Sequence, residues 1–388
     1  MSREPGKNGG NPIRVLHLFS NTKWTGPAEP ALNLCVALRR IGVEADFACS
    51  AVPSGEANTL IETARDRGIE PILRFRLGKH RNPLYNWLDR RLLSTFLAET
   101  SYDLIHCHMD NDHRIALKPA NQHGIPLIRS SYYGTGFPDK SDCATLAKSA
   151  AHIIEPSQRA FEDDQAALGL PSERMTVIPN AVDTERFDPV RTVPDGRRWL
   201  HIPADAFVIG IVARMQTHRR YEDLFEAVRR LAEAYPQVHL LVVGRGTRQE
   251  QVAFTPVQEM GLSDRVHFSG YVSGENYVGM LKAFDVKVFL MPGSDGTCRA
   301  VREAMAMARP AVVADRGMLP EIVEDGVTGM VCDGSPEGLY NALAPLVTDP
   351  AQARTMGRAA REQAVRLFSL DTQAQAVRGV YESVLRVS

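Results

Sequence analysis

The chain has 388 residues, and its 45 Lys and Arg side chains are balanced by 46 Asp and Glu, which leaves a formal net charge of −1. This length, with 44% hydrophobic and 23% charged residues, predicts a globular protein of two domains that needs no disulfide or metal to hold its cores. The near-neutral balance argues against a general nucleic-acid-binding protein, because such proteins usually carry a clear basic excess.

The cysteines and the hydropathy favour a reducing, aqueous compartment. The six cysteines are scattered with no C-x-x-C pair, so we expect buried free thiols and neither a disulfide framework nor a metal site. Residues 1–12 are polar and lack the apolar core of a signal peptide, and no apolar run approaches the ~20 residues that span a bilayer. We therefore expect a soluble, cytoplasmic protein.

The first half of the chain alternates short apolar runs with helical patterns. Residues 13–20 form an apolar run of strand type, a loop with glycine and proline follows, and the apolar residues of 28–41 recur at helical spacing. Strands that alternate with helices predict a parallel sheet covered on both faces. Further elements of this series are predicted at 44–50, 59–67, 103–108 and 126–131.

A second series of the same kind begins at residue 207. The proline-rich segment 188–203 separates the two series and is predicted to be a linker. We therefore predict an α/β protein with two Rossmann-like, doubly wound domains that face a central, ligand-binding cleft, followed by C-terminal helices. The elements of this half are predicted at 207–212, 222–235, 239–243, 266–270, 286–290, 310–314, 349–366 and 369–385.

The segment after Leu290 carries the most specific chemical signal. A strand is predicted to end at Leu290, and a glycine-containing loop leads into a helix predicted from Thr297 to Ala308. A glycine-rich turn at a helix N-terminus presents free N–H groups to an anion, and the carboxylates of Asp295 and Glu303 can accept hydrogen bonds from hydroxyl groups. Such a site suits a sugar nucleotide. The structural alternative is a capping Asp295 and a surface Glu303.

This segment, D-G-T-C-R-A-V-R-E-A-M-A-M-A-R-P-A-V-V-A-D, resembles the E-x7-E donor motif of glycosyltransferase family 4, whose members are retaining enzymes of the GT-B fold. The resemblance implies that Glu303 holds the donor ribose and that Asp295, where the family usually has Glu, contacts the donor sugar. Backbone amides at Gly296, Thr297 and Cys298 would help to bind the diphosphate.

Other motifs agree with the resemblance over nearly the whole chain. V-A-R-M-Q-T-H-R-R-Y-E-D-L is similar to G-R-L-x-x-x-K-G-x-x-x-L, and it places Arg214 and Arg219 on the basic pair that grips the donor diphosphate. L-V-V-G-R-G contains Gly244, and V-H-F-S-G-Y-V ends at Val272, where the family backbone meets the base. T-G-P-A-E places Gly26 near the diphosphate or the acceptor. On residue chemistry alone, the adjacent Arg219 and Arg220 would indicate a solvated basic helix start.

Three departures from the family pattern stand out. Tyr133 occupies the position of a family histidine; its phenol can bind a sugar hydroxyl on the acceptor side, but a pKa of about 10 makes it a poor base. Ala308 replaces a glycine, which we expect to be a tolerated change in packing. Pro27 follows Gly26 where the family has a second glycine, which stiffens the loop.

A cluster of histidine and aspartate residues follows the strand predicted at 103–108. One interpretation is a metal site, since Asp110, Asn111 and Asp112 spell the D-x-D of metal-dependent glycosyltransferases of another fold. The resemblance implies instead that this strand end lines the cleft without metal, with His108 as a polar group on the acceptor side. We therefore expect no metal, and no cofactor other than the nucleoside-diphosphate sugar that serves as substrate.

The stretch from Arg65 to Arg91 has a local excess of five positive charges, accompanied by apolar and aromatic residues at partly helical spacing. Such a patch can bind an anionic membrane surface, as a peripheral protein does on the inner face of the membrane, or a phosphate-bearing acceptor. A core-facing helix with a solvated basic face explains the same pattern equally well.

Taken as a whole, the resemblance implies a retaining glycosyltransferase that moves a sugar from a UDP- or GDP-sugar to a hydroxyl of a carbohydrate, lipid-linked or other acceptor. Cell-surface polysaccharide, glycolipid or glycoconjugate synthesis would be its pathway. Residues 1–190, joined by a helix at 370–388, would bind the acceptor, and residues 191–369 the donor. A sugar-nucleotide epimerase or hydrolase of the same fold and a non-catalytic sugar-nucleotide-binding protein are the alternatives.

Overall fold

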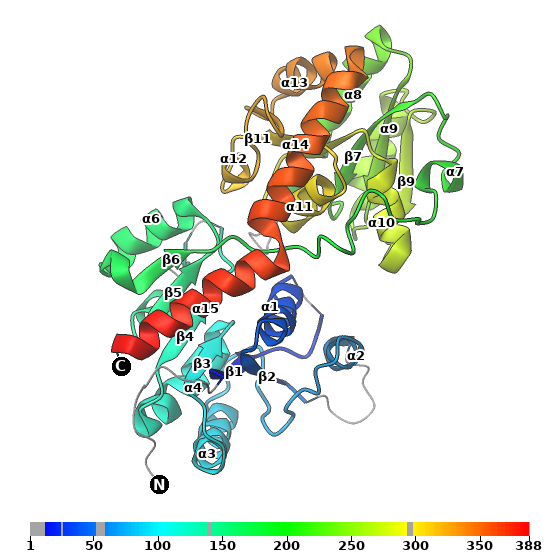
Figure 1. Cartoon of the computed structure of the whole chain (residues 1–388). Helices are drawn as coiled ribbons and strands as arrows, with labels where there is room; N and C mark the ends of the chain where they lie inside the picture. Colours follow the sequence, from blue (N-terminus) through cyan, green and yellow to red (C-terminus); the bar gives the residue numbers. More distant parts are fainter. Residues whose placement is uncertain are drawn as a thin grey trace. The chain divides into compact units, whose positions relative to one another are not determined.

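The chain forms two compact units in the computed structural model (Figure 1). Unit 1 contains residues 12–180 and 370–387, and unit 2 contains residues 181–292 and 298–369. Each unit is built on one six-stranded sheet in which all neighbouring strands are parallel. The structure describes residues 12–24, 26–51, 59–134, 136–138, 142–292 and 298–387.

The sheet of unit 1 has the strand order β2-β1-β3-β4-β5-β6. Its strands are β1 (Arg14–Phe19), β2 (Glu44–Cys49), β3 (Leu104–Cys107), β4 (Leu127–Ser130), β5 (His152–Glu155) and β6 (Met175–Val177). Its helices are α1 (Ala28–Arg40), α2 (Thr59–Asp66), α3 (Pro83–Glu99), α4 (Asp110–His123), α5 (Cys143–Ala147), α6 (Gln158–Leu168) and α15 (Leu370–Val387).

Side chains of β1 and β3 alternate between two different environments. Leu16 and Ile105 belong to an apolar core that also contains residues of α3 and α4. Successive side chains of a strand point to opposite faces, so the neighbouring His17 and His106 lie on the other face. That face meets the C-terminal helix α15, whose Tyr381 hydroxyl lies 2.6 Å from Nδ1 of His106.

The sheet of unit 2 has the strand order β12-β11-β10-β7-β8-β9. Its strands are β7 (Phe207–Val212), β8 (Val238–Val243), β9 (Val266–Gly270), β10 (Val286–Phe289), β11 (Ala311–Ala314) and β12 (Gly329–Cys332). Its helices are α7 (Gly196–Trp199), α8 (Tyr221–Ala234), α9 (Thr255–Glu259), α10 (Gly274–Ala283), α11 (Arg299–Ala306), α12 (Leu319–Ile322), α13 (Pro336–Thr348) and α14 (Pro350–Phe368).

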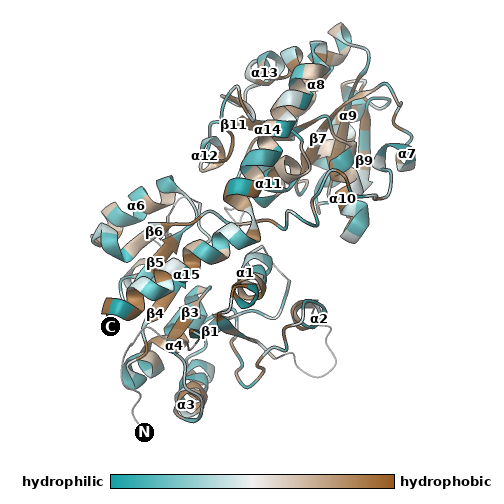
Figure 2. Cartoon of the chain, in the orientation of Figure 1, coloured by the Kyte–Doolittle hydropathy of each residue, from teal (hydrophilic) through white to brown (hydrophobic). Residues whose placement is uncertain are grey.

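Both faces of this second sheet are buried. Ile209 and Ile211 of β7 pack with α8 and α13, whereas Val208 packs with α10, α11 and α14 on the opposite face. Strands covered on both sides read as nearly continuous apolar runs, which is why the sequence predicted them well. Figure 2 shows such apolar strands lying beneath helices of mixed hydropathy in each unit.

The proline-rich segment predicted as a linker is part of unit 2, so that prediction is wrong. Its residues are tied to the unit by ion pairs between Arg191 and Glu275 (3.1 Å) and between Arg197 and Asp285 (2.7 Å). The units divide after Asn180, earlier than the expected boundary at residue 190, because the apolar residues that follow pack in the core of unit 2.

Ala308 differs from its neighbours in backbone conformation. Its φ is +56°, in the left-handed region. The sequence suggested that replacing the family glycine changes packing, but the replacement instead affects the backbone conformation. That conformation costs a non-glycine residue about 1–2 kcal/mol, against about 0.5–1 kcal/mol of extra chain entropy for glycine. We expect Ala308→Gly to raise the free energy of unfolding by about 0.5–1 kcal/mol, measured by urea titration. A less stable variant would contradict this expectation.

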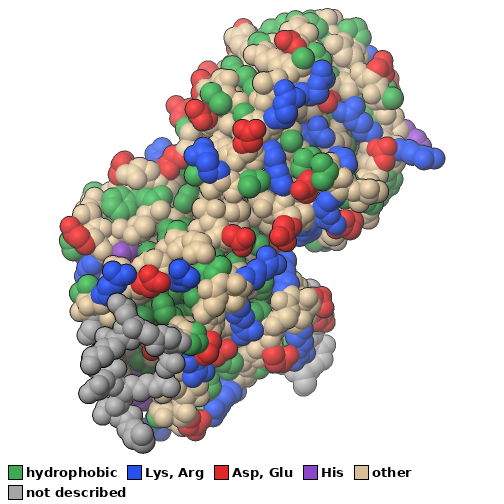
Figure 3. Space-filling view, viewed as in Figure 1, with side chains coloured by type: hydrophobic (Ala, Val, Ile, Leu, Met, Phe, Trp, Pro, Cys, Tyr) green, Lys and Arg blue, Asp and Glu red, His purple; other side chains and the backbone are tan. Residues whose placement is uncertain are grey.

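The surface and the thiols agree with the composition. Lys and Arg side chains alternate with Asp and Glu on the face drawn in Figure 3. All six cysteines are free, and all except Cys332 are buried. Among the described residues, no helix has the length and apolar character that a bilayer-spanning segment requires.

Candidate functional site

Most of the predicted donor residues of unit 2 lie at one edge of its sheet. In a parallel sheet all strands end at the same edge, and ligands bind in the loops there. The loop after β7 carries Arg214 and Arg219, and the loop after β8 begins at Gly244. Val272 follows β9, and the loop after β10 leads to Cys298 and α11. Asp295, Gly296 and Thr297 lie outside the described residues.

Arg219 is the better placed of the two predicted cations. It is half-buried at the end of a short 3-10 helix (Thr217–Arg219), and its Nη1 donates a 2.8 Å hydrogen bond to the carbonyl of Met291. This bond holds the guanidinium against the loop that follows β10. Arg214 is exposed in the same loop. Arg220 is paired with Asp223 and adopts φ +57° at a position where the family motif has glycine.

Two glycines after β8 are required by close backbone packing. A Cβ atom at Gly244, where φ is +138°, would lie 2.4 Å from the carbonyl oxygen of Ala213. One at Gly246 would lie 2.0 Å from the carbonyl oxygen of Met215. The loops after β7 and β8 therefore touch through their backbones, which fixes the segment that carries Arg214.

Glu303 lies inside unit 2 and not on a helix surface, so the surface alternative is wrong. Its side chain is only 3% exposed. The hydroxyl of Tyr277 donates a 2.5 Å hydrogen bond to Oε2, and Nε of Arg299 lies 3.1 Å from Oε1. Each carboxylate oxygen can accept more than one hydrogen bond, which is the capacity that binding a pair of hydroxyl groups requires. The helix begins at Arg299, after a buried Cys298 with φ +49°.

Sequence reasoning missed Lys287, a lysine within the apolar strand β10. Its side chain is completely buried, and its Nζ donates a 3.0 Å hydrogen bond to the carbonyl of Val288. Burial holds the pKa of this amine well below its usual range, while the nearby charge of Glu303 raises it and that of Arg219 lowers it. The signal was one charged residue in the run V-K-V-F-L.

An exposed aromatic residue stands beside Val272. Tyr271 follows β9, and the guanidinium of Arg245 lies 5.1 Å from the centre of its ring. Val272 itself is half-buried and packs against the core. An aromatic ring under a cation offers a flat stacking surface at the edge where the resemblance places the base.

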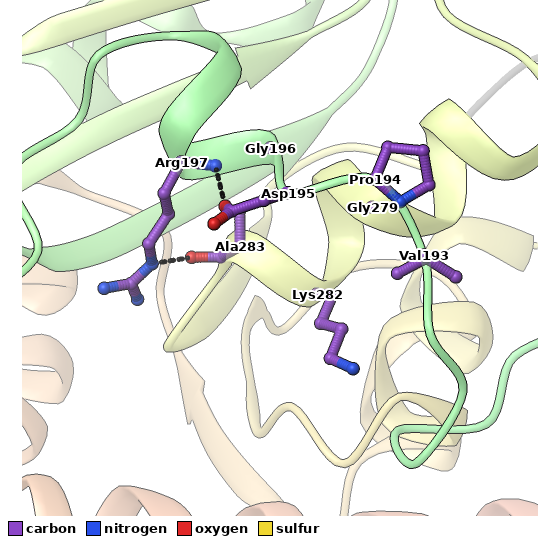
Figure 4. A pocket seen from close by; sticks show the side chains of 8 residues that line it. All are labelled: Val193, Pro194, Asp195, Gly196, Arg197, Gly279, Lys282 and Ala283. Atoms are coloured by element: carbon purple, nitrogen blue, oxygen red, sulfur yellow. Dashed lines mark hydrogen bonds between the residues drawn. The ribbon is translucent and has the colours of Figure 1, made fainter.

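A cavity of about 300 Å³ lies away from these loops (Figure 4). Its lining includes Arg197 and Lys282, beside the segments that lead into β7 and β10, so it sits at the amino end of the strands. Nζ of Lys282 donates to the carbonyl of Arg191 at 2.7 Å, and Nε of Arg197 donates to that of Ala283 at 2.9 Å. Both cations are therefore engaged by backbone carbonyl groups of the protein, and the cavity is not the predicted donor site.

In unit 1, His108 belongs to a buried group of histidines and hydroxyls. The chain of contacts runs from Tyr132 to His108 (2.7 Å), His17 (2.9 Å), Tyr381 (3.4 Å), His106 (2.6 Å) and Ser130 (2.8 Å). All three imidazoles are buried. His108 therefore supports Tyr132. The sequence suggested that His108 faces the acceptor, but both of its ring nitrogens are already hydrogen-bonded within the protein.

The same histidines could be read as a metal site. Their ligand nitrogens lie within 4.8 Å of one another. All six ring nitrogens, however, already have a hydrogen-bond partner in the chain from Tyr132 to Ser130. When the three imidazoles are neutral, each imidazole and each of the three hydroxyl groups has one proton to donate. Every group from Tyr132 to His106 can then donate to the next group in the chain, which satisfies all five contacts. A metal ion would have to break several of these bonds.

The D-x-D sequence forms the start of α4. The Asp112 carboxylate accepts hydrogen bonds from the backbone N–H groups of Ser20 (2.9 Å) and Met109 (3.0 Å). Asp110 accepts from the buried Arg129 (2.6 Å) and from the hydroxyl of Tyr133 (3.0 Å). Both carboxylates thus organise the loops of unit 1.

Tyr133 is half-buried between this carboxylate and the core. Burial and the charge of Asp110 raise its pKa above the usual value, so the phenol stays protonated at neutral pH and can donate but not act as a base. Gly26 is half-buried just before α1, next to Pro27 at the helix N-cap.

Neutral buried imidazoles make stability depend on pH. Burial lowers the pKa of His17 to about 3 and holds those of His106 and His108 well below the usual range, so the unfolded chain binds more protons below pH 6.5. The free energy of unfolding should therefore fall as the pH falls below 6.5, by about 1.4 kcal/mol per pH unit for each imidazole.

Buried Asp112 and Glu155 act with the opposite sign, because burial raises their pKa values, that of Asp112 to about 7. A variant isolates the histidine contribution. We expect His106→Gln to flatten the slope between pH 6.5 and 5 by about 1.4 kcal/mol per pH unit, measured by urea unfolding at each pH. An unchanged slope would show that His106 is already charged in the folded protein.

Two family descriptions match this chain, one in each half. Residues 25–186 match Glycosyltransferase Family 4, and residues 195–363 match Glycosyl transferases group 1. The chain belongs to glycosyltransferase family 4. Its two parallel six-stranded sheets are those of the GT-B fold, and the protein is a glycosyltransferase.

Individual relatives agree with this assignment. The D-inositol 3-phosphate glycosyltransferase of Corynebacterium glutamicum (strain R) is 26% identical over 381 residues, which are 91% of this chain and 90% of that protein. The lipopolysaccharide core biosynthesis mannosyltransferase LpcC of Rhizobium leguminosarum bv. viciae is 33% identical over 54% of this chain and 60% of its own. HepE of Anabaena, solved in complex with UDP, superposes with a TM-score of 0.79 at 21% identity, over 96% of this glycosyltransferase and 100% of HepE.

Proposed function

We propose that this glycosyltransferase moves a sugar from a nucleoside-diphosphate sugar to an acceptor hydroxyl, with retention of configuration at the anomeric carbon. The observation that supports it most is the edge of the unit 2 sheet. There a fixed Arg219 lies in the loop after β7, and the buried carboxylate of Glu303 lies on α11, the helix that follows β10. One suits a diphosphate and the other a ribose.

The chemistry follows from the charge that develops during transfer. When the bond from the sugar to the diphosphate breaks, negative charge grows on the departing oxygen, and cations placed beside it stabilise the transition state. Arg214 and Arg219 would supply this stabilisation, and Asp295 would bind the donor sugar. Because the arginines neutralise the leaving group, we propose transfer that requires neither a metal ion nor a general acid.

UDP-sugars are the first donors to test, and GDP-sugars the second. HepE has also been solved with UDP-glucose, and the exposed Tyr271 beside Arg245 offers a stacking surface for a base. We propose that unit 2 binds the donor and that unit 1 binds the acceptor, a carbohydrate or lipid-linked hydroxyl in polysaccharide, glycolipid or glycoconjugate synthesis. The Tyr133 hydroxyl donates its proton to Asp110, so its oxygen would accept a hydrogen bond from a hydroxyl of that acceptor.

The decisive experiment separates donor binding from transfer. Calorimetric titration with UDP-, GDP- and ADP-sugars should give saturable binding for one base, and release of the free nucleotide should accelerate when a hydroxyl acceptor is added. Binding of none of these donors would overturn the proposal. Full turnover without any acceptor would instead identify the epimerase or hydrolase alternative, and binding without turnover the non-catalytic one.

A further inference from the structure

Helix α3 carries apolar side chains on two of its faces. Leu93, Phe96 and Leu97 are buried in the core of unit 1. Leu84, Trp87 and Leu92 recur at spacings of three and five residues on an outer face, and they are 62%, 45% and 44% exposed. A helix at a protein surface normally presents polar residues to water, so a second apolar face indicates a contact outside the chain.

Exposed cations surround this outer face. Arg91 lies with its guanidinium 4.2 Å from the ring centre of Trp87, and Arg76 lies at the same distance from Tyr85. Lys79 is exposed in the loop that precedes α3. Residues 76–92 contain five Lys and Arg but one acid, Asp89, which is buried and accepts from the backbone N–H groups before the helix.

The structure also shows which positive charges of the stretch from Arg65 to Arg91 are already neutralised. Arg65 is paired with Glu70 (2.8 Å), Arg67 with Glu29 (3.4 Å) and Arg74 with Glu99 (2.9 Å). Arg81 also has an acidic partner, Asp142 at 3.8 Å. The remaining excess of positive charge lies in residues 76–92, which we name the basic–aromatic surface.

We propose that the basic–aromatic surface docks this enzyme on a membrane that contains anionic lipids. Its chemistry matches the two layers of a bilayer interface. Trp87 and Tyr85 are amphipathic rings of the kind that settle at headgroup depth, and Leu84 and Leu92 can enter the acyl boundary beside them. Arg76, Lys79 and Arg91 would meet the lipid phosphates, each adding an attraction that salt screens.

A vesicle assay with the full chain tests this proposal. At low salt, we expect the protein to co-sediment with vesicles of phosphatidylcholine mixed with phosphatidylglycerol, and to stay in the supernatant with phosphatidylcholine alone. High salt should release it. Failure to bind the anionic vesicles, or equal binding to both kinds, would overturn the proposal.

Substitutions locate the contact. We expect the double variant Lys79→Gln/Arg91→Gln to bind anionic vesicles about 30-fold more weakly, because each cation near such a surface contributes a roughly constant attraction. Leu84→Ser/Trp87→Ser should weaken binding while keeping its salt dependence. The matched control is Arg198→Gln/Trp199→Ser, which removes a cation and a tryptophan of similar exposure (49%) from α7 of unit 2 and should change nothing. Equal losses in the control would contradict the assignment.

Two further measurements separate a membrane contact from misfolding and from self-association. Donor-sugar binding by the surface variants should match that of the unaltered enzyme, which would show that the variants fold. If the enzyme proved unable to transfer a sugar, the proposed function would fail, but vesicle binding would still be expected. Sedimentation equilibrium should give the same mass for the variants and the unaltered enzyme. A dimer abolished by the same substitutions, without vesicle binding, would assign the surface to a second copy of the chain and overturn the membrane contact.

Discussion

Replacing Arg219 with alanine should lower turnover by two to three orders of magnitude. The guanidinium is fixed by its 2.8 Å hydrogen bond to the carbonyl of Met291, so it is organised before the donor arrives. Loss of one such preorganised group at a developing negative charge typically costs about 10²–10³ in kcat. Release of free nucleotide in the presence of donor and acceptor measures the effect.

Arg358→Ala is the matched control for this variant. Arg358 is exposed on α14 of the same unit and binds only Thr355 among the described residues, at 3.0 Å. Its removal should leave turnover unchanged. If the two variants had equal activities, Arg219 would not be the group that stabilises the diphosphate, and Arg214 would be the next residue to test.

Two substitutions of Glu303 should have separable effects. Glu303→Gln keeps the side-chain shape and the oxygen that accepts from Tyr277, but it removes the negative charge that would bind a ribose hydroxyl. A hydrogen bond to a charged group is worth about 1.5–3 kcal/mol, so donor affinity should fall about 10- to 150-fold. Titration calorimetry with the preferred donor measures this loss.

Both substitutions remove the negative charge near Arg299 and the buried Lys287, but Glu303→Ala in addition removes the oxygen that accepts from Tyr277, so it should destabilise unit 2 by about 1–3 kcal/mol more than Glu303→Gln. Thermal unfolding of the two variants beside Glu362→Gln, an exposed position on α14, checks this. If Glu303→Ala proved as stable as the control, the carboxylate would have no structural role in unit 2.

Strands and helices that pack against a core could be predicted from sequence, because their buried positions carry apolar residues in a regular pattern. β7 was expected at 207–212 and forms there, and α8 starts one residue before its predicted start. The family and the fold could also be predicted, since the donor motifs are local in sequence. Ala308 and the segment 188–203 were misjudged, because a backbone dihedral and a tertiary ion pair leave no local pattern.

The residues that surround the candidate site were harder to predict from the sequence. Tyr277 reaches Glu303 from another helix, α10, and only the folded chain shows that they meet, whereas Arg299 lies one turn before Glu303 on the same helix. The histidine chain combines His17, His106 and Tyr381, which are separated by as many as 364 positions. The sequence shows His106 and His108 in one predicted strand and His17 far from both, and only the fold shows that all three are buried side by side and support loops instead of contacting substrate.

The assignment of α15 to unit 1 has a consequence for the order of folding. Unit 2 is inserted between Asn180 and Leu370, so the first unit contains both the beginning and the end of the described chain. During synthesis, His17 and His106 emerge first, and their partner Tyr381 is made only with the last helix. Unit 2 can fold as soon as its continuous segment is complete. A truncation before residue 370 should therefore expose the amino-terminal sheet to proteolysis and leave the adjacent, later-made unit intact.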